Sequence, residues 1–283
     1  MTSPQFAQAT KQGRYYNIPG YDDITHVSVT NIINSLSKPA LAPAAAKHAG
    51  ERAVQRETEW HAIQCEEGTE AARKFISAAF REYTTYRADL GSAVHFACEV
   101  FDEHVTTGPE FGVAFDDYLI EYLTEHWATK MSEHRLTVAK NVELIRKHVE
   151  QYDRACRENG IVWLDRERTV CSPEHGYAGT LDGIVEMDGR TYVLDIKTGF
   201  VSAESVPLQL AAYRFATHEV HGDHTQERTQ WVNGGLVLQL KPASYKLLPV
   251  RCDVEVFGTF IDAKKVWEWQ NGLSKTAIGE EWL

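Results

Sequence analysis

The sequence has few cysteines, and none of them has the spacing of a zinc knuckle or a redox motif. No C-x-x-C pair occurs among the five cysteines, which are Cys65, Cys98, Cys156, Cys171 and Cys252. Zinc knuckles use closely spaced cysteine pairs, and disulfide frameworks use several cysteines in a short chain. We therefore expect neither kind of scaffold in these 283 residues.

A long hydrophobic run is also missing. No stretch approaches the roughly 18 consecutive apolar residues of a membrane span. The opening phrase MTSPQFAQATKQGRYY contains no apolar core of signal-peptide length. These two absences predict a cytoplasmic protein with no membrane contact.

Positive charge is in short supply as well. The chain has 29 lysines and arginines against 40 aspartates and glutamates, and its formal net charge is −11. Such a chain does not coat nucleic acid by bulk electrostatics, because phosphate binding needs a surplus of basic side chains. Any DNA contact must be local. A carboxylate metal site is still compatible with DNA, since bound cations reverse the sign of the local field.

The hydrophobic pattern divides the chain into a helical first part and a second part rich in strands. Residues 1–25 are polar and aperiodic, which predicts a flexible arm. We expect a single α/β domain over 26–283, mostly helical over 26–160 and with a sheet core flanked by helices over 161–283. The predicted helices cover 30–36, 43–60, 67–86, 89–105, 112–132, 137–159, 207–220 and 253–272. The predicted strands cover 162–171, 177–187, 190–197, 232–241 and 245–252, with a loop over 222–230.

Asp188 and Gly189 form a two-residue turn signal between the second and third predicted strands. A type I′ turn there fixes the register of the hairpin, and counting outward from it places Asp182 directly opposite Asp195. Facing carboxylates about 5 Å apart repel each other unless something binds them. A divalent cation such as magnesium is the expected binder, because such ions prefer oxygen ligands.

Lys197 lies two residues after Asp195, so the strand period places both side chains on the same face of the sheet. Two carboxylates with a metal ion and a lysine are what metal-assisted phosphodiester hydrolysis needs. The cation polarises the phosphate and lowers the pKa of bound water, and the lysine orients that water or stabilises the developing charge. The alternative is an ordinary ion-pair ladder on a solvated strand face.

The stretch GTLDGIVEMDGRTYVLDIKTG, followed by PLQLAAY, resembles the PD-(D/E)XK nuclease superfamily. It is most similar to the RecB-type exonuclease branch, which includes phage recombination and CRISPR-associated exonucleases. The resemblance implies a restriction-endonuclease-like core, with a mixed central sheet flanked by helices. It makes Asp182 and Asp195 metal ligands and Lys197 the catalytic lysine, and it adds the main-chain carbonyl of Ile196 as a further ligand.

Three more residues match the motifs of this branch, and each has a plainer interpretation. His95 follows Gly91 in a Gly-x-x-x-His context, which implies a further metal ligand, but a lone histidine beside a core stripe is usually a hydrogen-bonded edge residue. Gln209 and Tyr213 fit a Gln-x-x-x-Tyr signature and would hold a DNA phosphate or the catalytic lysine. Surface polarity in the first turns of a helix is the alternative for this pair.

Glu167 could supply a carboxylate for a second metal ion, as in some relatives. Its neighbours Arg166 and Arg168 favour a surface ion pair instead.

The resemblance implies a magnesium-dependent deoxyribonuclease, with manganese as a substitute. It implies an exonuclease that acts on linear DNA in phage-type recombination, replication or repair and leaves 5′-phosphate and 3′-hydroxyl ends. Some RecB-type members hold an iron–sulfur cluster, but here only Cys252 lies in the last third, so no cluster is expected. No G-x-x-x-x-G-K-[ST] motif occurs, so a helicase partner would be a separate chain. A strand-annealing protein is the other expected partner.

Two other classes of protein stay open at this stage. One is a catalytically silent DNA-binding or assembly module that kept the nuclease fold, although such a module has no reason to keep two opposed carboxylates. The other is a structural metalloprotein, which a DNA-facing strip of basic residues would argue against. The candidates for such a strip, each equally compatible with a solvated helix face, are Lys47, Arg52, Arg56, Arg81 and Arg87.

Overall fold

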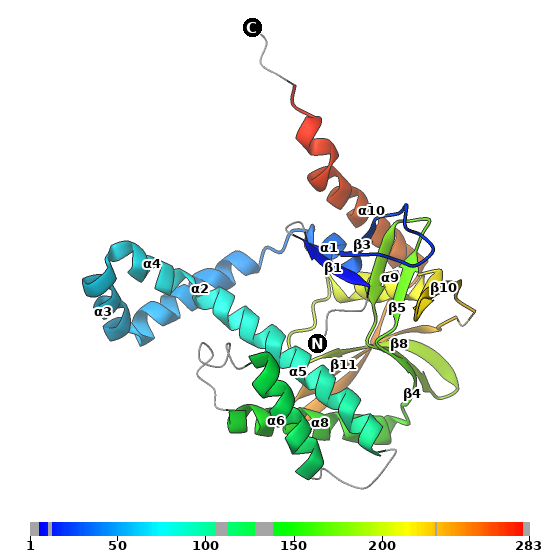
Figure 1. Cartoon of the computed structure of the whole chain (residues 1–283), viewed down its shortest axis with the longest axis horizontal. Helices are drawn as coiled ribbons and strands as arrows, with labels where there is room; N and C mark the ends of the chain where they lie inside the picture. Colours follow the sequence, from blue (N-terminus) through cyan, green and yellow to red (C-terminus); the bar gives the residue numbers. More distant parts are fainter. Residues whose placement is uncertain (1–5, 11–12, 106–112, 128–137, 230, 280–283) are drawn as a thin grey trace. The chain divides into compact units, whose positions relative to one another are not determined.

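A computed structural model describes residues 6–10, 13–105, 113–127, 138–229 and 231–279 of the chain. Contacts divide the chain into two compact units. The first joins residues 1–36 to residues 147–283, and the second contains residues 37–146. We call them the sheet unit and the helical unit (Figure 1).

Helices make up most of the described residues of the helical unit. On the longest of them, Leu90, Val94 and Ala97 are buried at helical spacing and form the core stripe that the sequence predicts. The helices are α2 (Leu41–Gln55), α3 (Glu57–Glu67), α4 (Thr69–Ser77), α5 (Ala79–Val105), α6 (Val113–Trp127) and the start of α8 (Val138–Asn159), which continues into the sheet unit.

The predicted helix boundaries in this unit need correction. The helix expected over 43–60 is interrupted at Arg56, whose guanidinium pairs with Glu59 and lies 4.4 Å from the centre of the Phe75 ring. The boundary expected near residue 87 falls instead at Ala78, and α5 runs on without a break. The break at Arg56 involves packing between helices, which the local pattern does not contain. Residues 112 and 128–132 of the predicted helix over 112–132, and residue 137 of the next one, lie outside the described residues.

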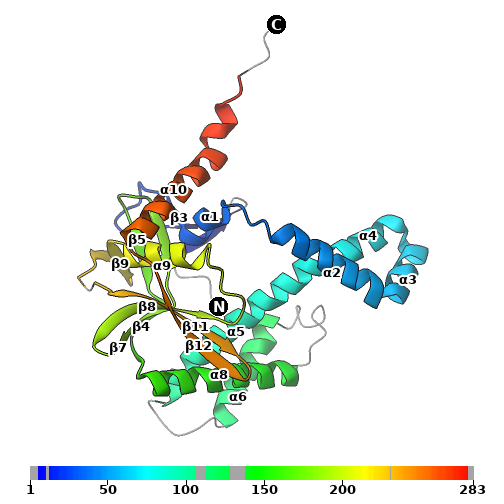
Figure 2. The same cartoon turned by 180° about the vertical axis from the view of Figure 1, so that it is seen from behind.

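Two sheets form the sheet unit. One has seven strands in the order β1-β2-β3-β6-β5-β9-β10, and the other has five in the order β12-β11-β8-β7-β4. Parallel pairing joins β3 to β6 and β8 to β11, and the other neighbours are antiparallel, so both sheets are mixed. Figure 2 shows the five-stranded sheet from behind, with β11 and β12 as a long hairpin. The strands are β1 (Ala7–Thr10), β2 (Gly13–Tyr16), β3 (His26–Ser28), β4 (Val162–Arg166), β5 (Thr169–Ser172), β6 (Tyr177–Thr180), β7 (Gly183–Met187), β8 (Arg190–Lys197), β9 (His218–His221), β10 (His224–Glu227), β11 (Gly234–Lys241) and β12 (Ser244–Val250).

Two of the predicted long strands change sheets partway along. The strand expected over 162–171 breaks at Glu167, which has a φ of 47°, and the strand expected over 177–187 breaks at Asp182. The two breaks are hydrogen-bonded to each other, because the amide of Glu167 donates to the carbonyl of Asp182 at 3.1 Å. Gly183 allows Trp163 to pack directly on the backbone here, since a Cβ atom at residue 183 would lie 2.3 Å from that indole ring. A bend of this kind is how strands pass from one sheet to another.

Where the structure describes it, the segment 1–25, expected to be a flexible arm, contains two strands. β1 and β2 form an antiparallel hairpin, β2 pairs with β3, and β3 pairs with β6. Tyr16 and Ile18 are buried, with 2% and 0% of their surfaces exposed. The polar composition misleads because the hairpin pairs with β3, and β3 is in turn held by β6, which lies about 150 residues further along the chain.

The segment over 207–230 also differs from the prediction. The helix expected to reach residue 220 is α9 (Val206–Arg214), and it ends early because the guanidinium of Arg228 takes the carbonyls of Tyr213 and Ala216. The expected loop over 222–230 contains β10, which pairs with β9.

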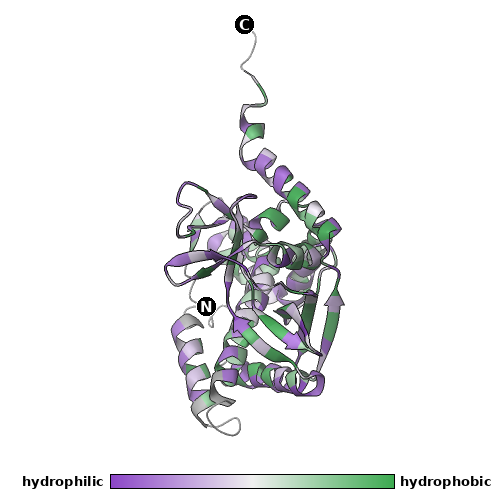
Figure 3. Ribbon diagram, turned by 90° about the vertical axis from the view of Figure 1, so that its right-hand side faces the viewer, coloured by the Kyte–Doolittle hydropathy of each residue, from purple (hydrophilic) through white to green (hydrophobic). Residues whose placement is uncertain are grey.

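Helices α1 (Val29–Asn34), α9 and α10 (Val254–Asn271) pack with the strands around the core of the sheet unit, and a 3₁₀ helix, η1 (Leu273–Thr276), follows α10. Ser28 caps α1, since its hydroxyl accepts from the amide of Asn31 at 3.0 Å. Along α10 hydrophobic positions alternate with hydrophilic ones (green and purple in Figure 3), and Phe260 and Ala263 face the core.

Candidate active site

The β7–β8 hairpin has the register that the turn signal predicts. Met187 pairs with Arg190, and the ladder continues to Gly183 and Leu194. The turn residues Asp188 and Gly189 have φ angles of 51° and 70°, as a type I′ turn requires. The next two positions outward are Asp182 and Asp195.

Both aspartates are held at the same end of β8. The Oδ2 atom of Asp182 accepts from the amide of Ile196 at 2.7 Å. The Oδ1 atom of Asp195 accepts from the Nζ atom of Lys197, also at 2.7 Å. The structure therefore brings together the two carboxylates and the lysine that the sequence places on one face.

Burial decides against the solvated ion-pair ladder. Asp195 has only 2% of its surface exposed, and the side chain of Lys197 has 29% exposed. An ordinary surface pair contributes little and needs no such burial. A buried carboxylate beside a second carboxylate is costly unless cations compensate it, and one lysine supplies a single positive charge for two negative ones.

The lysine stays charged in this setting. Burial by itself lowers the pKa of Lys197. The negative charges of Asp195 and Asp182 raise it by more, so the net result is a pKa above the usual value for lysine. Lys197 is thus a cationic hydrogen-bond donor rather than a neutral base.

Helix α9 contributes Gln209 and Tyr213 to the same region. The Nε2 atom of Gln209 donates to the Tyr213 hydroxyl at 3.3 Å, and Tyr213 is buried with 4% of its surface exposed. Surface polarity is therefore the wrong interpretation for Tyr213. Its pKa is raised mainly by burial, with smaller effects from Tyr16, Asp195 and Asp182, so the hydroxyl keeps its proton.

Gly179, at the end of β6, allows α9 to approach the site closely. A Cβ atom at residue 179 would lie 2.6 Å from the Cε1 atom of Tyr213 and 3.2 Å from Val29. We expect Gly179→Ala to destabilise the fold by about 1–3 kcal/mol, because the buried ring must move. Thermal unfolding checks this as a fall of about 2–10 °C in Tm. Gly258→Ala is the control, because nothing lies within 4 Å of its added Cβ on α10, and alanine there should leave Tm unchanged or raise it.

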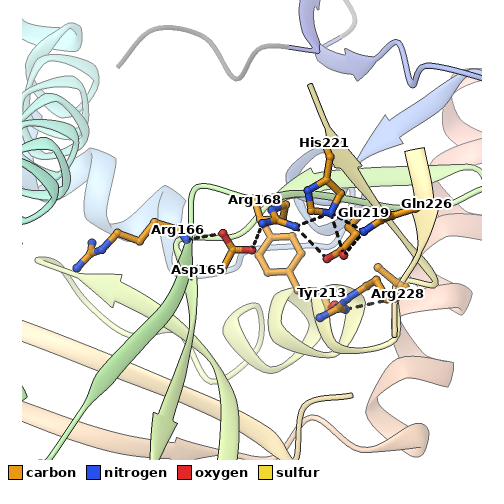
Figure 4. A network of polar contacts seen from close by, with 9 residues as sticks. Asp165, Arg166, Arg168, Tyr213, Glu219, His221, Gln226 and Arg228 are labelled. Atoms are coloured by element: carbon orange, nitrogen blue, oxygen red, sulfur yellow. Dashed lines mark hydrogen bonds and ion pairs between the residues drawn. The ribbon is translucent and has the colours of Figure 1, made fainter. Parts of the chain in front are cut away.

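Glu167 lies beside Asp182 at the break between the two sheets. Their carboxylates offer oxygen atoms within 4.8 Å of each other, and Glu167 has the left-handed backbone noted above. Such conformations in non-glycine residues concentrate at functional sites. Arg168 pairs instead with Asp165 at 2.7 Å and with Glu219 at 3.2 Å (Figure 4). The Glu167 carboxylate is thus placed as a potential metal ligand.

The same network fixes the strands on either side of Glu167. Figure 4 shows Arg168 between Asp165 on β4 and the pair Glu219 and His221 on β9. The pKa of Glu219 is lowered, since hydrogen bonds from His221 and Gln226 and the charge of Arg168 together outweigh the effect of burial, which raises it. The bend between β4 and β5 is thereby tied to the edge of the seven-stranded sheet.

His95 lies on α5 in the helical unit, half-buried beside the stripe of Leu90, Val94 and Ala97. Its role as a metal ligand stays a prediction. Lys47 and Arg52 lie on α2, and Arg56 follows at the break before α3. Each pairs with a glutamate, as Lys47–Glu51, Arg52–Glu82 and Arg56–Glu59. A DNA-facing strip on this helix also stays a prediction.

Sequence reasoning missed Tyr16 on β2. Its hydroxyl lies 3.3 Å from the Thr180 hydroxyl, which in turn lies 3.1 Å from that of Thr169. Thr180 lies two residues before Asp182, so the N-terminal hairpin supports the strand that carries this carboxylate. The paired aromatics Tyr15 and Tyr16 after Gly13 are a weak strand signal that could have indicated β2.

Comparison with known proteins agrees with this geometry. The mixed α/β architecture is consistent with a restriction-endonuclease-like fold. The profile of the PD-(D/E)XK nuclease superfamily matches residues 60–276, and the chain belongs to that superfamily. No curated protein matches the chain. Among the described residues, no helix is long and apolar enough to cross a membrane.

Nucleases of this superfamily use divalent metal ions, and the residues present fit such an ion. Asp182 and Glu167 offer carboxylate oxygens within 4.8 Å of each other, and Asp195 lies at the same end of β8. Such hard oxygens are the ligands that magnesium and manganese prefer. The nuclease fold implies DNA as the substrate.

Proposed function

We propose that this protein is a magnesium-dependent deoxyribonuclease of the RecB-like exonuclease branch, acting on linear DNA. The observation that carries the proposal is the buried Asp195, bonded to Lys197 at 2.7 Å, with Asp182 fixed on the amide of Ile196 at the same end of β8. Hydrolysis of a phosphodiester bond needs positive groups near the charge that develops on the phosphate. Lys197 supplies one such group, and the two carboxylates can bind a cation that supplies another.

Asp182 and Asp195 would hold the metal ion, with the Ile196 carbonyl, Glu167 and His95 as further ligands. When bound, a divalent cation polarises the phosphate and lowers the pKa of coordinated water. Oxygen ligands with little nitrogen favour magnesium over zinc, and manganese should substitute for it.

Burial lowers the pKa of Lys197, but Asp195 and Asp182 raise it above the usual value, and Asp195 fixes the direction of the ammonium group. In that state it donates a hydrogen bond to the attacking water or to a phosphate oxygen and stabilises the charge that develops there. Tyr213 and Gln209 would position the lysine or the phosphate as neutral donors, because the Tyr213 hydroxyl keeps its proton.

A role in phage-type recombination, replication or repair is part of this proposal. It rests on the phrase GTLDGIVEMDGRTYVLDIKTG and the Gln209 and Tyr213 signature, which are similar to the RecB-type branch. A strand-annealing protein or a separate helicase would be the partner in such a pathway, and the basic residues of α2 would contact DNA locally.

End-labelled linear DNA, single-stranded and double-stranded, tests the proposal directly. We expect the purified chain to shorten it from an end with magnesium or manganese, to leave a closed circle intact, and to stop on addition of EDTA. Cutting of the circle would contradict the exonuclease role. DNA binding without any cutting in either metal would identify a catalytically silent module instead.

A further inference from the structure

The turn that follows β8 presents an aromatic ring to solvent next to the candidate active site. Phe200 comes three residues after Lys197, and 88% of its surface is exposed. Three residues of chain span at most about 11 Å. The ring therefore lies within reach of a nucleotide whose phosphate is held at Lys197.

The backbone that carries this ring is anchored on both sides. The Nε2 atom of Gln239 on β11 donates to the carbonyl of Gly199 at 2.7 Å. The Nζ atom of Lys241 donates to the carbonyl of Thr198 at 3.3 Å, and Thr198 itself has 5% of its surface exposed. On the other side, Val201 packs against the core of the sheet unit. Phe200 thus projects from a fixed turn, and its exposure is not that of a loose loop.

A ring in this position suits one kind of contact with DNA. Bases stack on exposed aromatic side chains, and the contact does not depend on positive charge. This matters for a chain with a net charge of −11, in which phosphate contacts must be few. A base inside a duplex has both faces covered by its neighbours, so it must leave the stack before a protein ring can cover it.

We infer that Phe200 is a stacking contact for an unpaired base next to the cleaved phosphodiester bond. The substrate in the site is then a single strand or a frayed end rather than an intact duplex. This inference rests on the proposed nuclease function and specifies the form of DNA that the site accepts.

Cleavage of a single-stranded oligonucleotide with magnesium tests the inference, with kcat/KM as the measurement. Loss of one base–aromatic contact corresponds to about a 5- to 150-fold change. We expect Phe200→Ala and Phe200→Leu to lower kcat/KM by that amount, mainly through KM, and Phe200→Trp to stay close to wild type. Trp231→Ala is the matched control. This tryptophan is 72% exposed, and its carbonyl accepts from Thr191 near the other end of β8, about 20 Å from Lys197 by strand length.

A second substrate separates stacking from a change in folding. In this strand, abasic tetrahydrofuran analogues replace the nucleotides around the cleaved bonds. On this substrate the kcat/KM of the wild type should fall by the factor that Phe200→Ala costs on normal DNA. The kcat/KM of Phe200→Ala should be the same on both substrates. The inference is overturned if Phe200→Ala lowers kcat/KM relative to wild type equally on both substrates, or does not lower it on normal DNA. The nuclease function would still stand. A wild-type chain that cuts neither substrate overturns both.

Discussion

Lys197→Met should lower the rate of DNA cleavage by about 10²- to 10³-fold or more, with little change in KM. Methionine keeps most of the apolar stem and removes the ammonium, so the developing charge on the phosphate loses a preorganised donor. The position is already tuned for this role, because Asp195 holds the ammonium at 2.7 Å and keeps it charged. Single-turnover cleavage with saturating magnesium measures the chemical step directly.

Lys246→Met is the control for this substitution. Lys246 is an exposed lysine on β12, in the same sheet, where it pairs with Gln239. The Lys246→Met variant should cut DNA at the wild-type rate. If Lys197→Met folds, as judged by its Tm, and still cuts within tenfold of wild type, Lys197 has no role in the chemical step.

Local sequence is enough to predict the part of the site on the β7–β8 hairpin. The turn residues Asp188 and Gly189 set the register, and the strand period then places Asp195 and Lys197 on one face. No distant contact is needed for either step. This is why the position of Asp182 beside β8 follows from the sequence.

The break between the two sheets does not follow from local sequence. It depends on Trp163 packing on Gly183 and on the hydrogen bond from Glu167 to the carbonyl of Asp182. A pattern of β-branched residues contains neither contact, so 162–171 and 177–187 are each predicted as one continuous strand. The same bend is what places Glu167 beside Asp182.

The N-terminal hairpin is missed for a different reason. Its strands are short and polar, and they are ordered by β3 and β6 rather than by their own periodicity. The hydroxyls of Tyr16 and Thr180 meet across 164 positions of sequence. Residues 7–16 also lie before the part of the chain that matches the superfamily profile, residues 60–276, so family resemblance does not predict them either.

Asp195→Asn should abolish both cleavage and the stabilisation of the fold by metal. A ligand that binds only the folded chain stabilises it by about 2.7 kcal/mol at a hundred times its Kd. For wild type this predicts a rise of about 5–10 °C in Tm when magnesium replaces EDTA. Asparagine removes the charge of a nearly fully buried carboxylate at the site, so the rise in Tm should disappear and the rate of cleavage should fall by at least about 10³-fold.

Asp188→Asn makes the same chemical change at the turn of the same hairpin. Asp188 is exposed and has a φ of 51°, which asparagine tolerates in a type I′ turn. This variant should keep both cleavage and the rise in Tm with magnesium. The comparison separates the metal site from the fold, because the two variants lose the same charge at opposite ends of the hairpin. A magnesium-dependent rise in Tm of wild-type size in Asp195→Asn would show that the ion binds elsewhere, and Asp195 would then serve to hold Lys197 alone.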